Sequence, residues 1–131
     1  MEQKTGSHET TITYPPAIFS TVLLLALVAA MIHMYFGAFV YSGNNSIPMY
    51  GIAAIYIVGV GLVAANFRRE LWLKVGTVWA VLLVVLWAAA AFLGNAPHTT
   101  DPLAYGVNIL EVALIISLLA LTRYSRVQTK S

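Results

Sequence analysis

Four long apolar stretches constrain the fold of this 131-residue chain more than any other feature. They cover residues 17–41, 47–67, 71–93 and 102–122, and each has about 20 residues or more. A helix of that length, rising about 1.5 Å per residue, crosses a hydrocarbon core about 30 Å thick. Because a backbone within lipid must satisfy its own hydrogen bonds, these stretches are expected to be helical. The sequence therefore predicts an all-α fold, a four-transmembrane-helix up-down-up-down bundle.

The composition agrees with a single membrane domain. Hydrophobic residues make up 60% of the chain and charged residues 9%, whereas a soluble domain carries about 25% charged residues. We expect one four-helix membrane domain over residues 17–122, an N-terminal tail over 1–16 and a C-terminal tail over 123–131. The polar start and the length of the first apolar stretch argue against a cleaved signal peptide. The spans leave no room for a soluble catalytic module.

The basic residues predict the orientation of the spans. They are Lys4, Arg68, Arg69, Lys74, Arg123, Arg126 and Lys130. With four spans, all of them fall on one side, while the connections 42–46 and 94–101 contain no Lys or Arg. Basic residues collect on the cytoplasmic side, so a multi-pass protein of the cell membrane with both termini cytoplasmic is expected. Anchoring to lipid headgroups accounts for the basic segment "FRRELWLK", and no nucleic-acid partner is indicated.

Pairs of small residues four positions apart predict close helix packing within the bundle. They are Ala26 with Ala30, Gly61 with Ala65, and Gly76 with Ala80. The start of the second span carries the turn residues "SGNNSIP", with Ser46 as a possible helix cap and Pro48 in the first turn.

Four polar side chains lie within the spans as a candidate intramembrane layer: His33, Tyr56, Asn108 and Glu111. Depth is counted along each span from the side of the connections 42–46 and 94–101, which contain no Lys or Arg. On this count His33, Tyr56 and Glu111 lie about 12–13 Å deep, and Asn108 lies one turn shallower. At 100° per residue His33 shares its face with small residues, which is typical of a packing face. Ionisable side chains in a membrane belong in such an interior.

We predict that Glu111 pairs with His33, and that Asn108 and Tyr56 complete the hydrogen bonds. The pair is either neutral on both sides or an ion pair, depending on access of water. Three interpretations stay open: a structural clasp that fixes helix register, a proton- or cation-linked transport site, and a contact with a cofactor or subunit.

Several chemistries lack the residues that they need. The chain has no cysteine, which excludes disulfides and thiolate ligands. His33 is the only histidine within a span, so a bis-histidine haem has no second buried ligand. His98 and Asp101 are too few ligands to predict a metal site. No nucleophile motif is present, and we expect no cofactor and no enzymatic activity.

Three segments carry a family resemblance: "HMYFG", "FRRELWLKVGTVWAVLLVVLW" and "VNILEVALI". They resemble small archaeal four-helix membrane proteins of the haloarchaeal type, over about residues 17–124. The resemblance implies the same four-span fold and no particular activity. From the residues, we expect a protein that acts through membrane partners, as a homo-oligomer or as an accessory subunit of a larger complex such as a redox assembly. The alternative is a small proton-linked transporter that uses Glu111 and His33.

Overall fold

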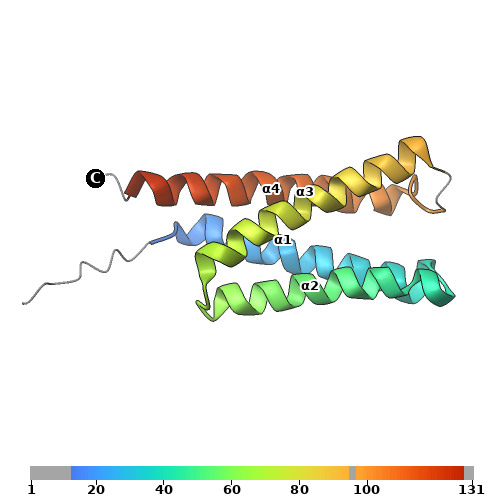
Figure 1. Cartoon of the computed structure of the whole chain (residues 1–131), viewed down its shortest axis with the longest axis horizontal. Helices are drawn as coiled ribbons and strands as arrows, with labels where there is room; N and C mark the ends of the chain where they lie inside the picture. Colours follow the sequence, from blue (N-terminus) through green and yellow to red (C-terminus); the bar gives the residue numbers. More distant parts are fainter. Residues whose placement is uncertain (1–12, 95–96, 129–131) are drawn as a thin grey trace, which may run out of the picture.

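The computed structural model describes residues 13–94 and 97–128, and within them it is all-helical with no strand. The four long helices run side by side (Figure 1). Their bounds are Pro16–Tyr35 for α1, Ile47–Ala64 for α2, Arg69–Leu93 for α3 and Pro102–Gln128 for α4. The predicted all-α fold is therefore confirmed, and so is the number of helices.

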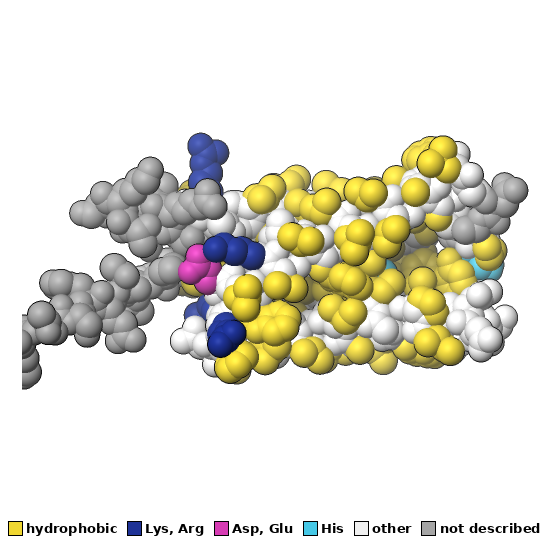
Figure 2. All heavy atoms as spheres, viewed as in Figure 1, with side chains coloured by type: hydrophobic (Ala, Val, Ile, Leu, Met, Phe, Trp, Pro, Cys, Tyr) yellow, Lys and Arg dark blue, Asp and Glu magenta, His cyan; other side chains and the backbone are white. Residues whose placement is uncertain are grey.

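All four helices are long and apolar enough to cross a membrane. The spanning segments are Pro16–Val40, Gly43–Ala64, Arg69–Leu93 and Pro102–Tyr124, with mean hydropathy between 2.0 and 2.3. Their outward surface is rich in large apolar side chains, whereas the Lys and Arg side chains in view gather at one end (Figure 2). These are the properties of a multi-pass membrane protein, because a soluble protein rarely exposes continuous apolar surface.

The first span is not one regular helix. After Tyr35 the chain makes a π-helical turn, Phe36–Val40, and a short 3-10 turn, Gly43–Asn45, leads into α2. A side chain on Gly37 is disfavoured, since its Cβ would lie 3.1 Å from Cζ of Tyr50. Ser46 occupies the position before α2, but its hydroxyl donates to the carbonyl of Gly43 instead of capping the helix. The predicted side-chain cap is therefore wrong.

Two other predicted boundaries also differ from the structure. The second span was expected to reach residue 67, but α2 ends at Ala64, and Asn66 and Arg68 then adopt positive φ angles of 59° and 45°. Helix α4 continues to Gln128, because the sequence after residue 122 contains no Pro or Gly to stop it. The predicted N-terminal tail lies mostly outside the described residues, at 1–12, whereas residues 123–128 of the predicted C-terminal tail belong to α4 and only 129–131 are not described.

Small side chains form much of the core and allow the helices to approach closely. Helix α1 packs against α2 and α4, and α3 packs against α4. The buried alanines are Ala26, Ala29, Ala30, Ala53, Ala80 and Ala104. Two of the three predicted small-residue pairs lie at this core, Gly76 being half-buried beside Ala80. The third does not, because Gly61 and Ala65 are exposed on the outside of α2.

Arg69, at the start of α3, contacts both α1 and α2 at the end of the bundle where the Lys and Arg side chains lie. Its Nε donates to the carbonyl of Val63 near the end of α2 at 2.9 Å, and its guanidinium lies 4.7 Å from the ring centroid of Phe19 in α1. This end is called the basic end below, and its described basic residues are Arg68, Arg69, Lys74 and Arg123.

We expect Arg69→Met to lower the free energy of unfolding by about 1–2 kcal/mol, because it removes a charge-assisted hydrogen bond and a cation–π contact. Arg68→Met is the matched control, since Arg68 is exposed and carries the same charge at the same end. Unfolding in a denaturing detergent, followed by circular dichroism, measures both variants. Equal losses in the two variants would show that the contacts of Arg69 contribute nothing beyond its charge.

Candidate functional site

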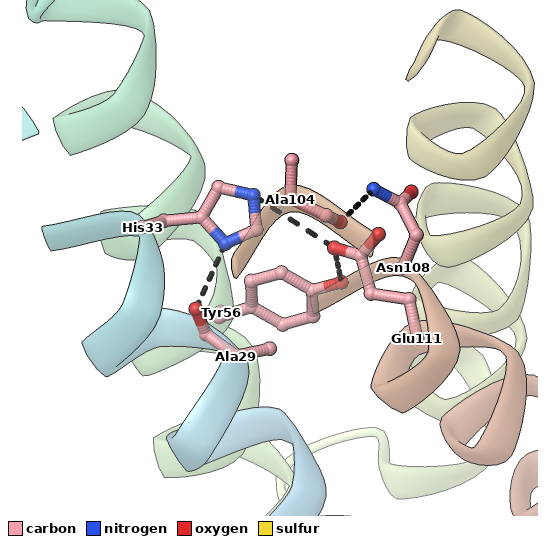
Figure 3. Close-up of polar contacts among 6 residues, drawn as sticks. All are labelled: Ala29, His33, Tyr56, Ala104, Asn108 and Glu111. Carbon is pink, nitrogen blue, oxygen red and sulfur yellow. Dashed lines mark hydrogen bonds and ion pairs between the residues drawn. The ribbon is translucent and has the colours of Figure 1, made fainter. Parts of the chain in front are cut away.

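Glu111 lies in the middle of the bundle and is 2% exposed. The hydroxyl of Tyr56 on α2 donates a hydrogen bond to its Oε1 at 3.0 Å. Figure 3 shows His33 on α1 facing the same carboxylate oxygen. Three helices thus bring one titratable side chain each to a single point, and all three side chains are buried.

The tautomer of His33 follows from its contacts. Its Nδ1 lies 2.8 Å from the carbonyl oxygen of Ala29, and because a carbonyl only accepts, Nδ1 carries a hydrogen. The other ring nitrogen, Nε2, faces Oε1 of Glu111 at 3.8 Å. That separation is too long for a hydrogen bond and short enough for an ion pair when the ring is charged. The proton that can be gained or lost therefore belongs to Nε2, on the side of Glu111.

Asn108 takes a different role from the one that the sequence predicted. Its Nδ2 donates to the carbonyl of Ala104 at 2.7 Å, one turn back along α4, and not to Glu111. If the amide were turned over, Oδ1 of Asn108 would face the carbonyl oxygen of Ala104, and two acceptors would repel each other. The positions of Nδ2 and Oδ1 are therefore fixed. Oδ1 is buried and accepts no hydrogen bond from any described residue. An unpaired buried acceptor costs about 1–3 kcal/mol, so it calls for a functional explanation.

The helix faces explain why the sequence places these groups together. His33 lies on the buried face of α1 with Ala26, Ala29 and Ala30, as the spacing of small residues predicted. On α4 the positions three and four residues apart, Ala104, Asn108 and Glu111, are all buried as well. The small side chains let the helices approach until the polar groups meet.

A cavity of about 270 Å³ lies beside this cluster. Its lining includes His33, Asn108 and Glu111 together with residues near the connections at the other end of the bundle, among them Tyr41 and His98. This end is called the His98 end below. Figure 2 shows the surface hollowed toward the end opposite the Lys and Arg side chains. The cavity therefore joins the His98 end to the buried carboxylate.

The mouth of the cavity is held by contacts between the two connections at the His98 end. The hydroxyl of Tyr41 donates to the carbonyl of Pro97 at 3.1 Å, and the ring of Tyr41 packs edge-on against His98. Burial, and then the charge of Asp101, raise the pKa of Tyr41, so its hydroxyl stays a donor over the physiological range. His98 in turn contacts Asp101, with 2.9 Å between Nδ1 and Oδ2.

Toward the basic end, the bundle is filled by apolar side chains. Leu114, Leu118 and Leu121 of α4 are each 3% exposed or less. A second, apolar cavity of about 70 Å³ lies there among the four helices, and Tyr56 lines it. Because Tyr56 also binds Glu111, which lines the larger cavity, its ring stands between the two spaces.

Sequence reasoning found the buried cluster but missed its surroundings. The predicted polar layer did not include His98 or Tyr41, yet both line the cavity that reaches Glu111. Trp87 lines the cavity too, and its Nε1 donates to the carbonyl of Thr99 at 2.9 Å. No periodic signal marks these contacts, because they join loops to helices. Among the described residues, no three His, Asp or Glu side chains gather as metal ligands.

No protein-family model, curated protein or solved structure matches this chain. The resemblance to haloarchaeal four-helix proteins therefore stays a prediction, as does the absence of enzymatic activity. The site has to be interpreted from its own geometry.

Proposed function

We propose that this protein is a small proton-linked transporter in which Glu111 and His33 carry the proton. The observation that carries the proposal is the cavity that joins the His98 end to the buried Glu111. A structural clasp needs no such access, whereas a carboxylate that exchanges protons does. Toward the basic end, Leu114, Leu118 and Leu121 are buried and the space beside them has an apolar lining, so that side offers a proton no polar path.

In this proposal the helices cross the membrane alternately, up-down-up-down, with both termini in the cytoplasm. The positive-inside rule supports the orientation, because Arg68, Arg69 and Lys74 lie at the basic end. The cavity then opens toward the outer side. Access from the cytoplasm requires Tyr56 to release Glu111, since its ring separates the larger cavity from the apolar one.

The proton chemistry rests on the 3.8 Å between His33 Nε2 and Glu111 Oε1. With neither group protonated, two acceptors face each other, and the long separation suits that state. A proton taken up by either group removes the repulsion, and on Nε2 it creates an ion pair. The site therefore holds a single proton more readily than none or two.

The titratable groups around this pair are limited. Tyr56 contributes from α2, and Tyr41 and His98 contribute from the connections at the His98 end, whereas α3 supplies only side chains without titratable groups to the described lining. These side chains of α3 are Leu83, Leu86, Trp87 and Ala90.

A hydrophobic carbodiimide tests whether Glu111 is reachable and titrates. The reagent adds to protonated carboxyl groups in apolar surroundings, so we expect an adduct on Glu111 that declines as the pH is raised. Peptide mass spectrometry measures the adduct, and Glu70, whose side chain is 57% exposed, serves as the reference carboxylate in the same chain. A Glu111 that stays unlabelled from about pH 5 to about pH 9 would be a structural clasp, and the proposal would be wrong.

One observation favours a second function, assembly with membrane partners. Gly61 and Ala65 form a small-residue pair that faces outward from α2, where an added Cβ on Gly61 meets nothing within 4 Å. Such pairs mediate contacts between membrane helices. Purification from native membranes in mild detergent tests this function: we expect the wild-type chain to be recovered as an oligomer or with larger subunits, and Gly61→Ile to be recovered alone. Recovery of both as single chains would exclude it.

A further inference from the structure

Several hydrogen-bond donors beside the larger cavity already donate to groups within the protein. The hydroxyl of Tyr56 donates to Glu111. Three nitrogen atoms donate to backbone carbonyls: Nδ1 of His33, Nε1 of Trp87 and Nδ2 of Asn108. A ligand that needs donors from the protein, such as an anion, therefore finds few in this part of the chain.

Acceptors that lack a full set of donors lie beside the cavity. They are Oδ1 of Asn108, which has no hydrogen-bond partner among the described residues, Nε2 of neutral His33, and the carboxylate of Glu111. Figure 3 shows the second carboxylate oxygen of Glu111 pointing to the side of Asn108. Asn108 is 7% exposed, so its unpaired oxygen is a buried group that lacks a donor. A primary ammonium group has three N–H donors and a positive charge, which match these acceptors.

The rest of the lining of the larger cavity suits the apolar part of a small organic ligand. Trp87 and Phe36 line the cavity, and aromatic rings attract cations as well as apolar groups. The volume of about 270 Å³ lies at the low end for ligand pockets, which limits the body to about one ring. A hard divalent cation fits worse, because it takes about six oxygen ligands and, among the described residues, only one carboxylate lines the cavity.

We propose that the cavity binds a small primary ammonium cation with an apolar or aromatic body, with its nitrogen held between Asn108 Oδ1, Glu111 and His33. This inference rests on the proposed transport function, for which it names the class of substrate. Binding of the cation requires the carboxylate form of Glu111, so cation and proton compete for one site. When the cation binds, the site releases its proton toward the His98 end. This release couples the transport of the cation to the transport of the proton.

Isothermal titration calorimetry of the full chain in lipid nanodiscs tests the inference, with empty nanodiscs subtracted. The probe is phenethylammonium, and the comparison ligands are its N-trimethyl derivative and phenethyl alcohol. We expect saturable binding of phenethylammonium, with affinity about tenfold or more higher than that of either comparison ligand, since only the primary ammonium supplies both charge and N–H donors. Its affinity is expected to fall as the pH is lowered, approaching about tenfold per pH unit for one competing proton.

Variants of Asn108 test whether the ammonium nitrogen of the ligand binds at Oδ1 of Asn108. Asn108→Leu is expected to weaken phenethylammonium about tenfold while leaving the N-trimethyl derivative unchanged, and Asn108→Asp is expected to retain the preference for the primary amine. Ile109→Leu, at an exposed position of the same helix, is the control for a change in α4. In a chain with Trp72→Phe and Trp79→Phe, Trp87 is the only tryptophan, and its fluorescence should change on titration.

The outcomes separate this inference from the proposed function. Equal affinities for the three ligands, or no saturable binding, overturn the ammonium site, even when Glu111 still reacts with carbodiimide in a pH-dependent way. Selective binding that depends on Asn108 supports the ammonium site. It does so even when no proton moves, in which case the proposed transport fails and a cation-binding protein remains. Loss of the preference in Ile109→Leu as well as in Asn108→Leu overturns the assignment of the nitrogen to Asn108.

Discussion

Glu111→Gln is expected to abolish the transient current that a pH jump drives across a solid-supported membrane containing this protein. Glutamine keeps the size of the side chain, and its amide oxygen still accepts the hydrogen bond from Tyr56. It cannot exchange a proton, so the charge displaced should fall at least about tenfold, to the level of lipid alone. The fold should survive, because no buried group loses its partner.

Glu70→Gln is the matched control for this measurement. Glu70 is the other carboxylate within a described helix, and it forms an exposed pair with Lys74 at 3.0 Å near the basic end. We expect the transient current of the Glu70→Gln variant to equal that of the wild-type chain. A Glu111→Gln variant that kept the full current would assign the buried carboxylate to helix register alone, and the proton-linked function would be excluded.

The second large effect concerns packing. Ala80 on α3 is fully buried in the core that contains Leu114 and Leu118 of α4. One turn earlier, a Cβ on Gly76 would lie 4.0 Å from Cδ1 of Leu118, so α3 and α4 are in van der Waals contact along this core. Ala80→Leu adds three carbon atoms there. We expect it to lower the free energy of unfolding by about 1–3 kcal/mol, because the helices have to separate or side chains have to leave their preferred rotamers.

Ala89→Leu tests the same substitution on the exposed side of the same helix. It should change stability by about 0.5 kcal/mol or less, since the added carbons meet no tightly packed neighbour. Unfolding in a denaturing detergent, followed by helical content, compares the two variants. Equal effects would mean that α3 does not pack against α4 at Ala80.

Much of the buried cluster was predictable from the sequence because helical periodicity is regular. Counting at 1.5 Å and 100° per residue placed His33, Tyr56 and Glu111 at one depth and set His33 on a buried face, and the structure brings the three together. The role of Asn108 was not predictable. Its amide had a choice between Glu111 and a backbone carbonyl one turn away, and only the local geometry of α4 decides for the carbonyl of Ala104.

The exposed pair Gly61 and Ala65 shows the limit of motif reasoning. A small-residue pair indicates that some helix can approach closely, but it does not say whether that helix belongs to the same chain. Likewise the end of α2 depends on local backbone conformation, such as the positive φ of Asn66, and hydropathy does not report it.

The sequence alone determined that this chain forms four apolar helices long enough to cross a membrane, because length and hydrophobicity are properties of each segment by itself. It also placed a carboxylate and an imidazole at the same depth. Only the tertiary structure decided that a cavity reaches them, that Tyr56 closes one side, and that Asn108 keeps an unpaired acceptor. These features arise where several helices and two connections meet, and the space left between packed side chains is not encoded in the pattern of any single helix.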